Sequence, residues 1–220
     1  LLALSGFFAT LGDMALGAAV RRLQGFWKGF AGCAAGDESA AKERLNAAAA
    51  SPAAQDAVLE TFRRVQDALD PDVVFALGRL LWPYATGKRK PNRFFRSMGR
   101  LLVDIDSTDL QKLKALLRAV VEYGSRMDDS TIRLDAWIRE SADPLRQGVG
   151  LLGTRVVLVE DLPGDFLFAL LKRHDFAHAL TGFGSVPEKN IELHVLTARA
   201  ILEVIDVESS PSSDEDVGGT

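Results

Sequence analysis

The spacing of apolar residues predicts a chain built mainly of helices. Between residues 38 and 125, apolar side chains recur every three or four positions, as they do along one face of a helix. Ser51-Pro52 and Asp70-Pro71 each combine an N-cap residue with proline at the first helical position. Helices are predicted over about residues 38–50, 52–69, 71–82 and 94–102, and from a capping box at Thr108 to a terminal Gly124.

The pattern changes after residue 128. Residues 131–138 fit either a short alternating strand or a turn of amphipathic helix, and the spacing leaves both open. Residues 155–159 are β-branched and bounded by turn residues, and residues 191–195 alternate, so both predict strands. A helix is expected from Gly164 to about Leu180, and a last helix capped by Thr197. The fold class predicted is mainly α, a multi-helix bundle-like region followed by a small α+β C-terminal part.

The two ends of the chain differ from the rest. Residues 1–20 carry a single charge, that of Asp13, a carboxylate that costs about 2.5–3.5 kcal/mol near the centre of a bilayer. We therefore expect a helix buried in the protein, with an interfacial membrane helix as the alternative, followed by a glycine-rich connector. Residues 208–220 hold four acids and predict a disordered acidic tail. The regions expected are 1–36, 37–125, 126–207 and 208–220.

Composition, cysteine count and net charge together exclude several classes of function. The 220 residues are 47% hydrophobic and 25% charged, as in an ordinary soluble domain, and we expect a cytoplasmic protein without a cofactor. The lone Cys33 excludes an intrachain disulfide framework and a cysteine-based zinc site. The net charge of -4 argues against a globally basic nucleic-acid protein, but it leaves room for a local basic patch.

One segment is strongly basic. Between Gly87 and Arg100 the chain carries six cations and no acid, a composition that can neutralise phosphates. The candidate polyanion-binding residues are Lys88, Arg89, Lys90, Arg93, Arg96 and Arg100. Tyr84, Phe94 and Phe95 lie near enough in sequence to offer stacking faces to unpaired bases. The alternatives are a solvated helix face whose cations pair with Asp104, Asp106 and Asp109, or contact with anionic lipid or an acidic partner.

A second candidate is a histidine pair. On the helix expected over residues 164–180, His174 and His178 stand four residues apart and so can chelate one metal ion. Asp175 or His194 would have to complete the site. The alternative is that both histidines extend the apolar face of the helix to its polar end.

Two further patterns have simpler explanations. Residues 148–153 match G-x-G-x-x-G, but a strand is expected after them and no helix, so we interpret them as a hinge or tight turn. The pairs Asp104/Asp106 and Asp128/Asp129 flank expected helices, where aspartate serves as a cap.

These observations favour a non-catalytic binding or regulatory module. Its basic segment would contact nucleic acid or another polyanion, and an unidentified protein partner is expected. Two alternatives stay open. One is a metal-dependent hydrolase that uses His174 and His178. The other is a structural protein-interaction module with a membrane-proximal N-terminal helix.

Overall fold

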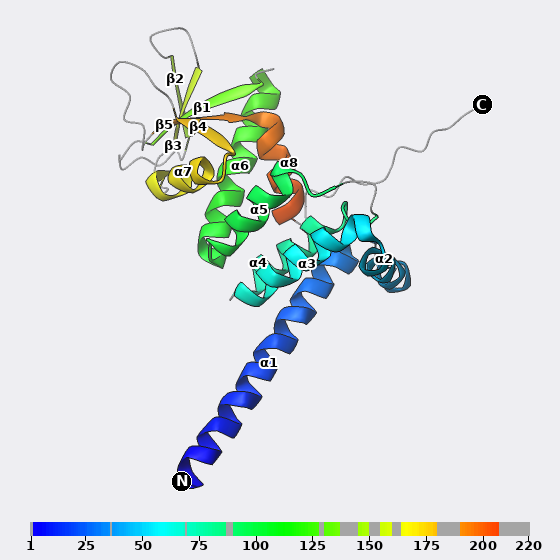
Figure 1. Ribbon diagram of the computed structural model, residues 1–220. Coiled ribbons are helices and arrows are strands. Elements are labelled where there is room, and N and C mark those ends of the chain that lie inside the picture. Colours follow the sequence, from blue (N-terminus) through cyan, green and yellow to red (C-terminus); the bar gives the residue numbers. More distant parts are fainter. Residues whose placement is uncertain are drawn as a thin grey trace, which may run out of the picture.

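A computed structural model describes residues 2–35, 37–68, 70–86, 90–127, 130–136, 145–149, 155–159, 164–179 and 190–206. It confirms a mainly helical fold with a small sheet (Figure 1). The helices in these ranges are α1 (Leu2–Gly32), α2 (Glu38–Ala50), α3 (Pro52–Asp67), α4 (Pro71–Leu81), α5 (Arg93–Val103), α6 (Ser107–Met127), α7 (Gly164–Arg173) and α8 (Val195–Ile205). The strands are β1 (Thr131–Ala136), β2 (Leu145–Val149), β3 (Arg155–Val159), β4 (Ala177–Ala179) and β5 (Asn190–His194).

Side-chain caps fix the starts of several helices. Asp37 accepts a hydrogen bond from the amide of Ala40, and Asp70 accepts one from the amide of Asp72, as N-caps do. Ser51 occupies the N-cap position of α3, but its side chain makes no capping hydrogen bond. The helices predicted over residues 38–102 are therefore confirmed, three of them beginning at Pro52, Pro71 and Arg93.

The capping box predicted at Thr108 is wrong. Helix α6 begins at Ser107, because the Asp106 carboxylate accepts a hydrogen bond from the amide of Asp109 at 2.8 Å and so caps the helix first. Gly124 does not end the helix either. An ion pair of 2.9 Å between Glu122 and Arg126, one turn apart, supports a further turn to Met127.

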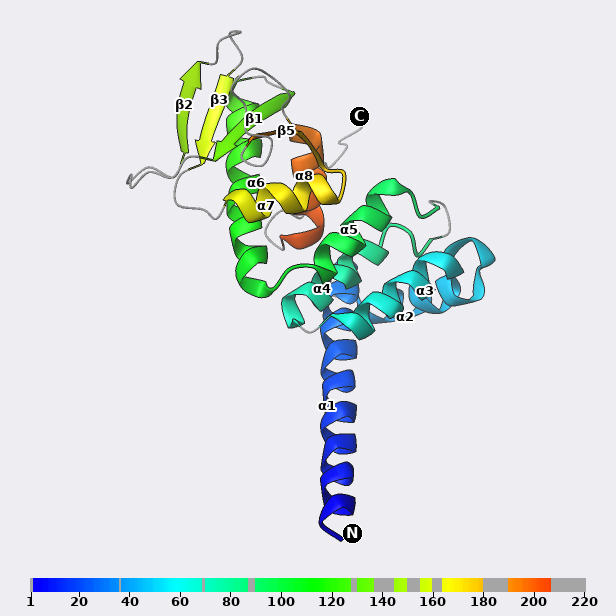
Figure 2. The ribbon, with the colours of Figure 1, turned by 60° about the vertical axis from the view of Figure 1, so that its left-hand side comes forward.

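The five strands form one sheet in the order β2-β3-β1-β5-β4, of which Figure 2 shows β2, β3 and β1 side by side. Strands β1 and β3 are parallel, and the other neighbours are antiparallel. The ambiguous segment from residue 131 is a strand, and Ile132 and Leu134 alternate into the core. Strands β3 and β5 confirm the predictions. Strand β2, whose residues LRQGV do not alternate, and strand β4, which has only three residues, were missed at the level of sequence.

The helix predicted to run to Leu180 is wrong. Helix α7 ends at Arg173, and Asp175 adopts a left-handed backbone conformation with φ of 63°, which aspartate tolerates better than most residues. This turn directs the chain into β4, where Ala177 and Ala179 pair with β5. The cap predicted at Thr197 is also wrong, since α8 already begins at Val195.

Helix α4 lies at the centre of the packing. Its residues Val73, Val74, Leu77, Leu80 and Leu81 are all buried. Helix α8, from the predicted region 126–207, packs against α4 and α6, which begin in the predicted region 37–125. Arg79 of α4 donates a hydrogen bond to the carbonyl of Glu203 at 2.8 Å. The boundary at residue 125 stays a prediction, and the predicted acidic tail lies outside the described residues.

Helix α1 differs most from the prediction. It continues through the expected connector at Gly25 and Gly29, and Phe26 and Phe30 are buried against the rest of the protein. A Cβ atom at Gly29 would overlap the carbonyl oxygen of Phe75, so glycine permits the close crossing with α4. Between Leu16 and Gln24, by contrast, no residue is buried, so the expected burial of this part of the helix is wrong. In the part of the chain that the structure describes, no helix has the length and apolar character that crossing a membrane requires.

Candidate polyanion-binding face of α5

Helix α5 has one apolar face and one cationic face. Phe95, Met98, Leu101 and Leu102 are fully buried beneath it. At its start, the Asn92 side chain accepts hydrogen bonds from the amide of Phe95 at 2.9 Å and from the Tyr84 hydroxyl at 3.0 Å. The helix is therefore fixed both by its cap and by the core below it.

The cations of this segment lie on the opposite face. Arg93, Arg96 and Arg100 follow one another at helical spacing, and each is exposed, as is Lys90 before the helix. We call Lys90, Arg93, Arg96 and Arg100 the α5 cation row. Lys88 and Arg89, the other two predicted binding residues, lie outside the described residues.

The α5 cation row is largely free of acids. Arg93 pairs with Asp175 at 3.1 Å, although its side chain remains 78% exposed. Arg96 and Arg100 make no ion pair with another described residue. The predicted pairing with Asp104, Asp106 and Asp109 is therefore not seen for these two arginines. An exposed ion pair such as the one at Arg93 contributes little free energy, so it can be exchanged for a phosphate.

The aromatic part of the prediction is wrong. Tyr84 and Phe95 are buried and pack against each other, with ring centroids 4.6 Å apart. Phe94 is half-buried and meets Phe176 edge to face at 5.8 Å. These rings pack inside the protein and do not form a surface on which bases could stack. Helix α5 contacts the rest of the protein through its apolar side, and the rings belong to that contact. The face therefore offers charge and hydrogen-bond donors, without free aromatic rings from these three residues.

Arg64 of α3 supports α5 from below, and sequence reasoning missed it. Its side chain is only 12% exposed, pairs with Glu60 at 2.6 Å and approaches the Phe95 ring to 5.8 Å. A Cβ atom at Gly99 would overlap the Arg64 guanidinium, so glycine leaves room for it under the helix. Sequence alone does not distinguish Arg64 from its exposed neighbour Arg63, because both are cations within the same predicted helix.

The two histidines of the candidate metal site do not share a helix. His174 lies in the turn after α7, is 5% exposed, and its Nε2 is 2.9 Å from a carboxylate oxygen of Asp104. His178 is exposed on β4 opposite Glu192, and His194 contacts Thr131 on β1. The spacing argument for chelation is therefore wrong, because α7 ends before both histidines. Among the residues that the structure describes, no group of three or more His, Cys, Asp or Glu side chains is arranged to hold a metal ion.

The remaining sequence patterns have structural roles where they are described. Gly148 and Val149 lie in β2, where they pair with Val156 and Arg155 of β3, and residues 150–153 of the glycine motif lie outside the described residues. Asp104 ends α5 and Asp106 begins α6, which confirms the helix-end interpretation of this pair, whereas Asp128 and Asp129 lie outside the described residues. Burial raises the pKa of the Cys33 thiol, which disfavours the nucleophilic thiolate.

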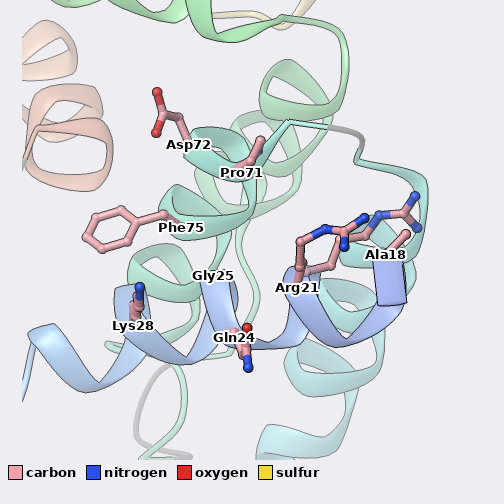
Figure 3. A pocket seen from close by; sticks show the side chains of 9 residues that line it. Ala18, Arg21, Gln24, Gly25, Lys28, Pro71, Asp72 and Phe75 are labelled. Carbon is pink, nitrogen blue, oxygen red and sulfur yellow. The ribbon is translucent and has the colours of Figure 1, made fainter. Parts of the chain in front are cut away.

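A second cationic surface surrounds a pocket between α1 and α4. The pocket has a volume of about 400 Å³, and Figure 3 shows side chains of both helices around it. Arg21, Arg22 and Lys28 of α1 line it together with Phe75 and Asp72 of α4. This surface was not predicted from the sequence, and Lys28 in particular was missed. Its spacing of seven residues from Arg21 was the available signal.

Comparison with known proteins finds no matching family model, no similar curated protein and no similar solved structure.

Proposed function

We propose that this chain is a non-catalytic binding module that contacts the phosphate groups of nucleic acid through the α5 cation row. The observation that carries the proposal is the exposure of Lys90, Arg93, Arg96 and Arg100 on one face, with no acid in the sequence between them. The rigid, buried underside of α5 supports it further, because cations held on a fixed helix lose less freedom on binding than cations on a loop.

The geometry favours a duplex as the ligand. Binding of unpaired bases depends on exposed aromatic rings, and the nearby rings of Tyr84 and Phe95 are buried. Double-stranded DNA has a higher charge density than a single strand, so cations that contact only phosphates gain more from it. Because such contacts carry no sequence information, we expect binding that does not depend on base sequence.

Binding to a labelled DNA duplex across a salt series tests the proposal. If each of the four described cations contacts one phosphate, log Kobs falls against log salt with a slope of about -3.6. The variant Arg96→Gln/Arg100→Gln removes two of these contacts and should make the slope shallower by about 1.8. A single strand of the same length should bind no tighter than the duplex.

A matched control removes two exposed cations from other surfaces. Lys42 lies on α2 and Arg199 on α8, and Lys42→Gln/Arg199→Gln changes the net charge by the same amount. The proposal requires this control to bind duplex as the wild type does. Equal weakening in the control and the α5 variant would mean that only net charge matters, and an absence of binding at low salt would overturn the proposal outright.

A further inference from the structure

Helix α1 consists of two halves with different surroundings. From Phe26 to Ala31 it is held by the rest of the protein, and Phe26, Gly29, Phe30 and Ala31 are buried. Residues 2–24, which we call the projecting half, run outward from this anchor (Figures 1 and 2), and their last residues, from about Ala18, meet α3 and α4. Leu16, Val20 and Leu23 of this half are 66%, 44% and 50% exposed. Large apolar side chains on a folded surface at this density mark a contact with something else.

Exposed apolar and polar residues lie on adjoining sides of α1 where the structure describes its side chains. At the helical rotation per residue, Leu16, Val20 and Leu23 share one side. Arg21, Gln24 and Lys28 share the side next to it. An exposed apolar side bordered by a cationic side is the arrangement of a helix that lies in a lipid interface.

Cations gather where the projecting half meets the folded core. Arg21 and Lys28 are exposed on the cationic side and line the pocket between α1 and α4 (Figure 3). Arg22 already donates a hydrogen bond to the carbonyl of Gln66 at 2.8 Å, so its guanidinium group is only partly available to a ligand. Asp72 is the acid among the lining residues. Cations beside an apolar helix complement the negative charge of anionic lipid headgroups.

The cations beside the apolar side favour lipid over a second copy of this chain. A symmetric contact between two copies brings the same residues together, so Arg21 and Lys28 of both copies would lie along one interface, where like charges repel. Acyl chains cover the apolar side, and anionic headgroups attract the adjacent cations. We propose that the projecting half of α1 inserts into the surface of an anionic bilayer, with Arg21 and Lys28 against the headgroup phosphates.

Flotation of the full chain with lipid vesicles tests this proposal. The probes are vesicles of phosphatidylcholine alone and vesicles that also contain phosphatidylserine. The wild type should float with both and bind the anionic vesicles more tightly. Arg21→Gln/Lys28→Gln should weaken binding to the anionic vesicles by roughly 25-fold, at about fivefold per cation, and leave binding to neutral vesicles unchanged.

Two further variants separate this surface from the others. Leu16→Asp/Val20→Asp should abolish flotation with both kinds of vesicle, because it places carboxylates on the inserted side. Arg96→Gln/Arg100→Gln alters only the α5 cation row and should float as the wild type does. Vesicle binding is thus independent of the nucleic-acid proposal, and either can fail alone. Circular dichroism of each variant verifies that its helical content is retained.

Two results would overturn the lipid proposal. One is an absence of flotation with either kind of vesicle. If the chain then also forms a dimer that Leu16→Asp/Val20→Asp dissociates, the occupant of the apolar side is a second copy. The other is flotation that Leu16→Asp/Val20→Asp leaves intact, which would place lipid contact elsewhere on the protein.

Discussion

The α5 cation row and the cations at the base of the projecting half carry similar charge in different surroundings. Beneath α5, the side chains of Phe95, Met98, Leu101 and Leu102 are fully buried, so Arg96 and Arg100 lie above a closed surface. Beside Arg21, the apolar residues Leu16, Val20 and Leu23 are open to solvent. A cluster of cations alone therefore does not indicate a class of partner. The exposed residues next to it distinguish a phosphate backbone from a lipid surface.

The largest effect should follow from separating α1 from α4. Gly29→Val places side-chain atoms where the carbonyl of Phe75 lies, and we expect it to lower the free energy of unfolding by more than about 3 kcal/mol. Gly32→Ala is the control, since a Cβ there meets nothing within 4 Å. Urea unfolding measures both. Similar stabilities for the two variants would contradict the close crossing that anchors α1.

An intermediate effect should follow at the contact between α5 and the turn after α7. Asp104→Ala leaves the buried ring of His174 without its carboxylate partner, at a cost of about 1–3 kcal/mol. Glu43→Ala, which removes an exposed acid from α2, should change stability by less than about 0.5 kcal/mol. Thermal unfolding compares the two. Equal values would mean that this contact does not help to hold the α5 cation row in place.

A smaller, pH-dependent effect is expected at Asp70. Burial alone would raise the pKa of this carboxyl, but hydrogen bonds from the Ser107 hydroxyl and from the amides of Asp72, Ser107 and Val73 outweigh it and lower the pKa. A lowered pKa in the folded state means that the carboxylate stabilises the protein above its unfolded pKa. This stabilisation is lost as pH falls through the folded pKa.

Asp70→Ala should therefore cost about 1 kcal/mol at neutral pH, as the loss of an N-cap does. The difference from wild type should shrink as the solution is acidified below the range in which free aspartate titrates. Urea unfolding at a series of pH values measures it. A difference that stays constant down to strongly acidic pH would show that the charge of Asp70 is not what fixes the start of α4 beside the α1 pocket.

The smallest effect should come from the exposed apolar residues themselves. Leu16→Asp/Val20→Asp should change the free energy of unfolding by less than about 0.5 kcal/mol, because both side chains lie outside the core. The same variant is expected to abolish vesicle binding. A strong loss of stability would show that this part of α1 is covered in the free protein, and the contrast with α5 would then disappear.

Local sequence patterns were sufficient to predict the positions of most helices between residues 38 and 103. Proline at the start of α3 and α4, and an apolar repeat through Phe95 and Met98, are properties of short windows, and they located α2 to α5 and the exposure of Arg93, Arg96 and Arg100. The capping box at Thr108 failed because a competing cap, Asp106, stood two residues before it.

The errors elsewhere have tertiary causes. Strand β4 is three residues long and exists because β5 offers it hydrogen-bonding partners. The glycines of α1 resemble a linker in sequence, but Gly29 and Gly78 are sites where two helices approach closely. Tyr84 and Phe95 were expected near a binding surface, but their rings pack against each other, a contact between two segments that residue spacing alone does not predict.

The central claim is that the two cationic surfaces bind different partners because exposed apolar side chains border the surface on α1, whereas buried ones lie beneath the surface on α5. Measuring duplex binding and anionic-vesicle binding side by side, for Arg96→Gln/Arg100→Gln and for Arg21→Gln/Lys28→Gln, tests it most directly. The account predicts that the first variant loses affinity only for the duplex and the second only for the vesicles. Equal losses of both activities in both variants would contradict it, since net charge alone would then determine binding.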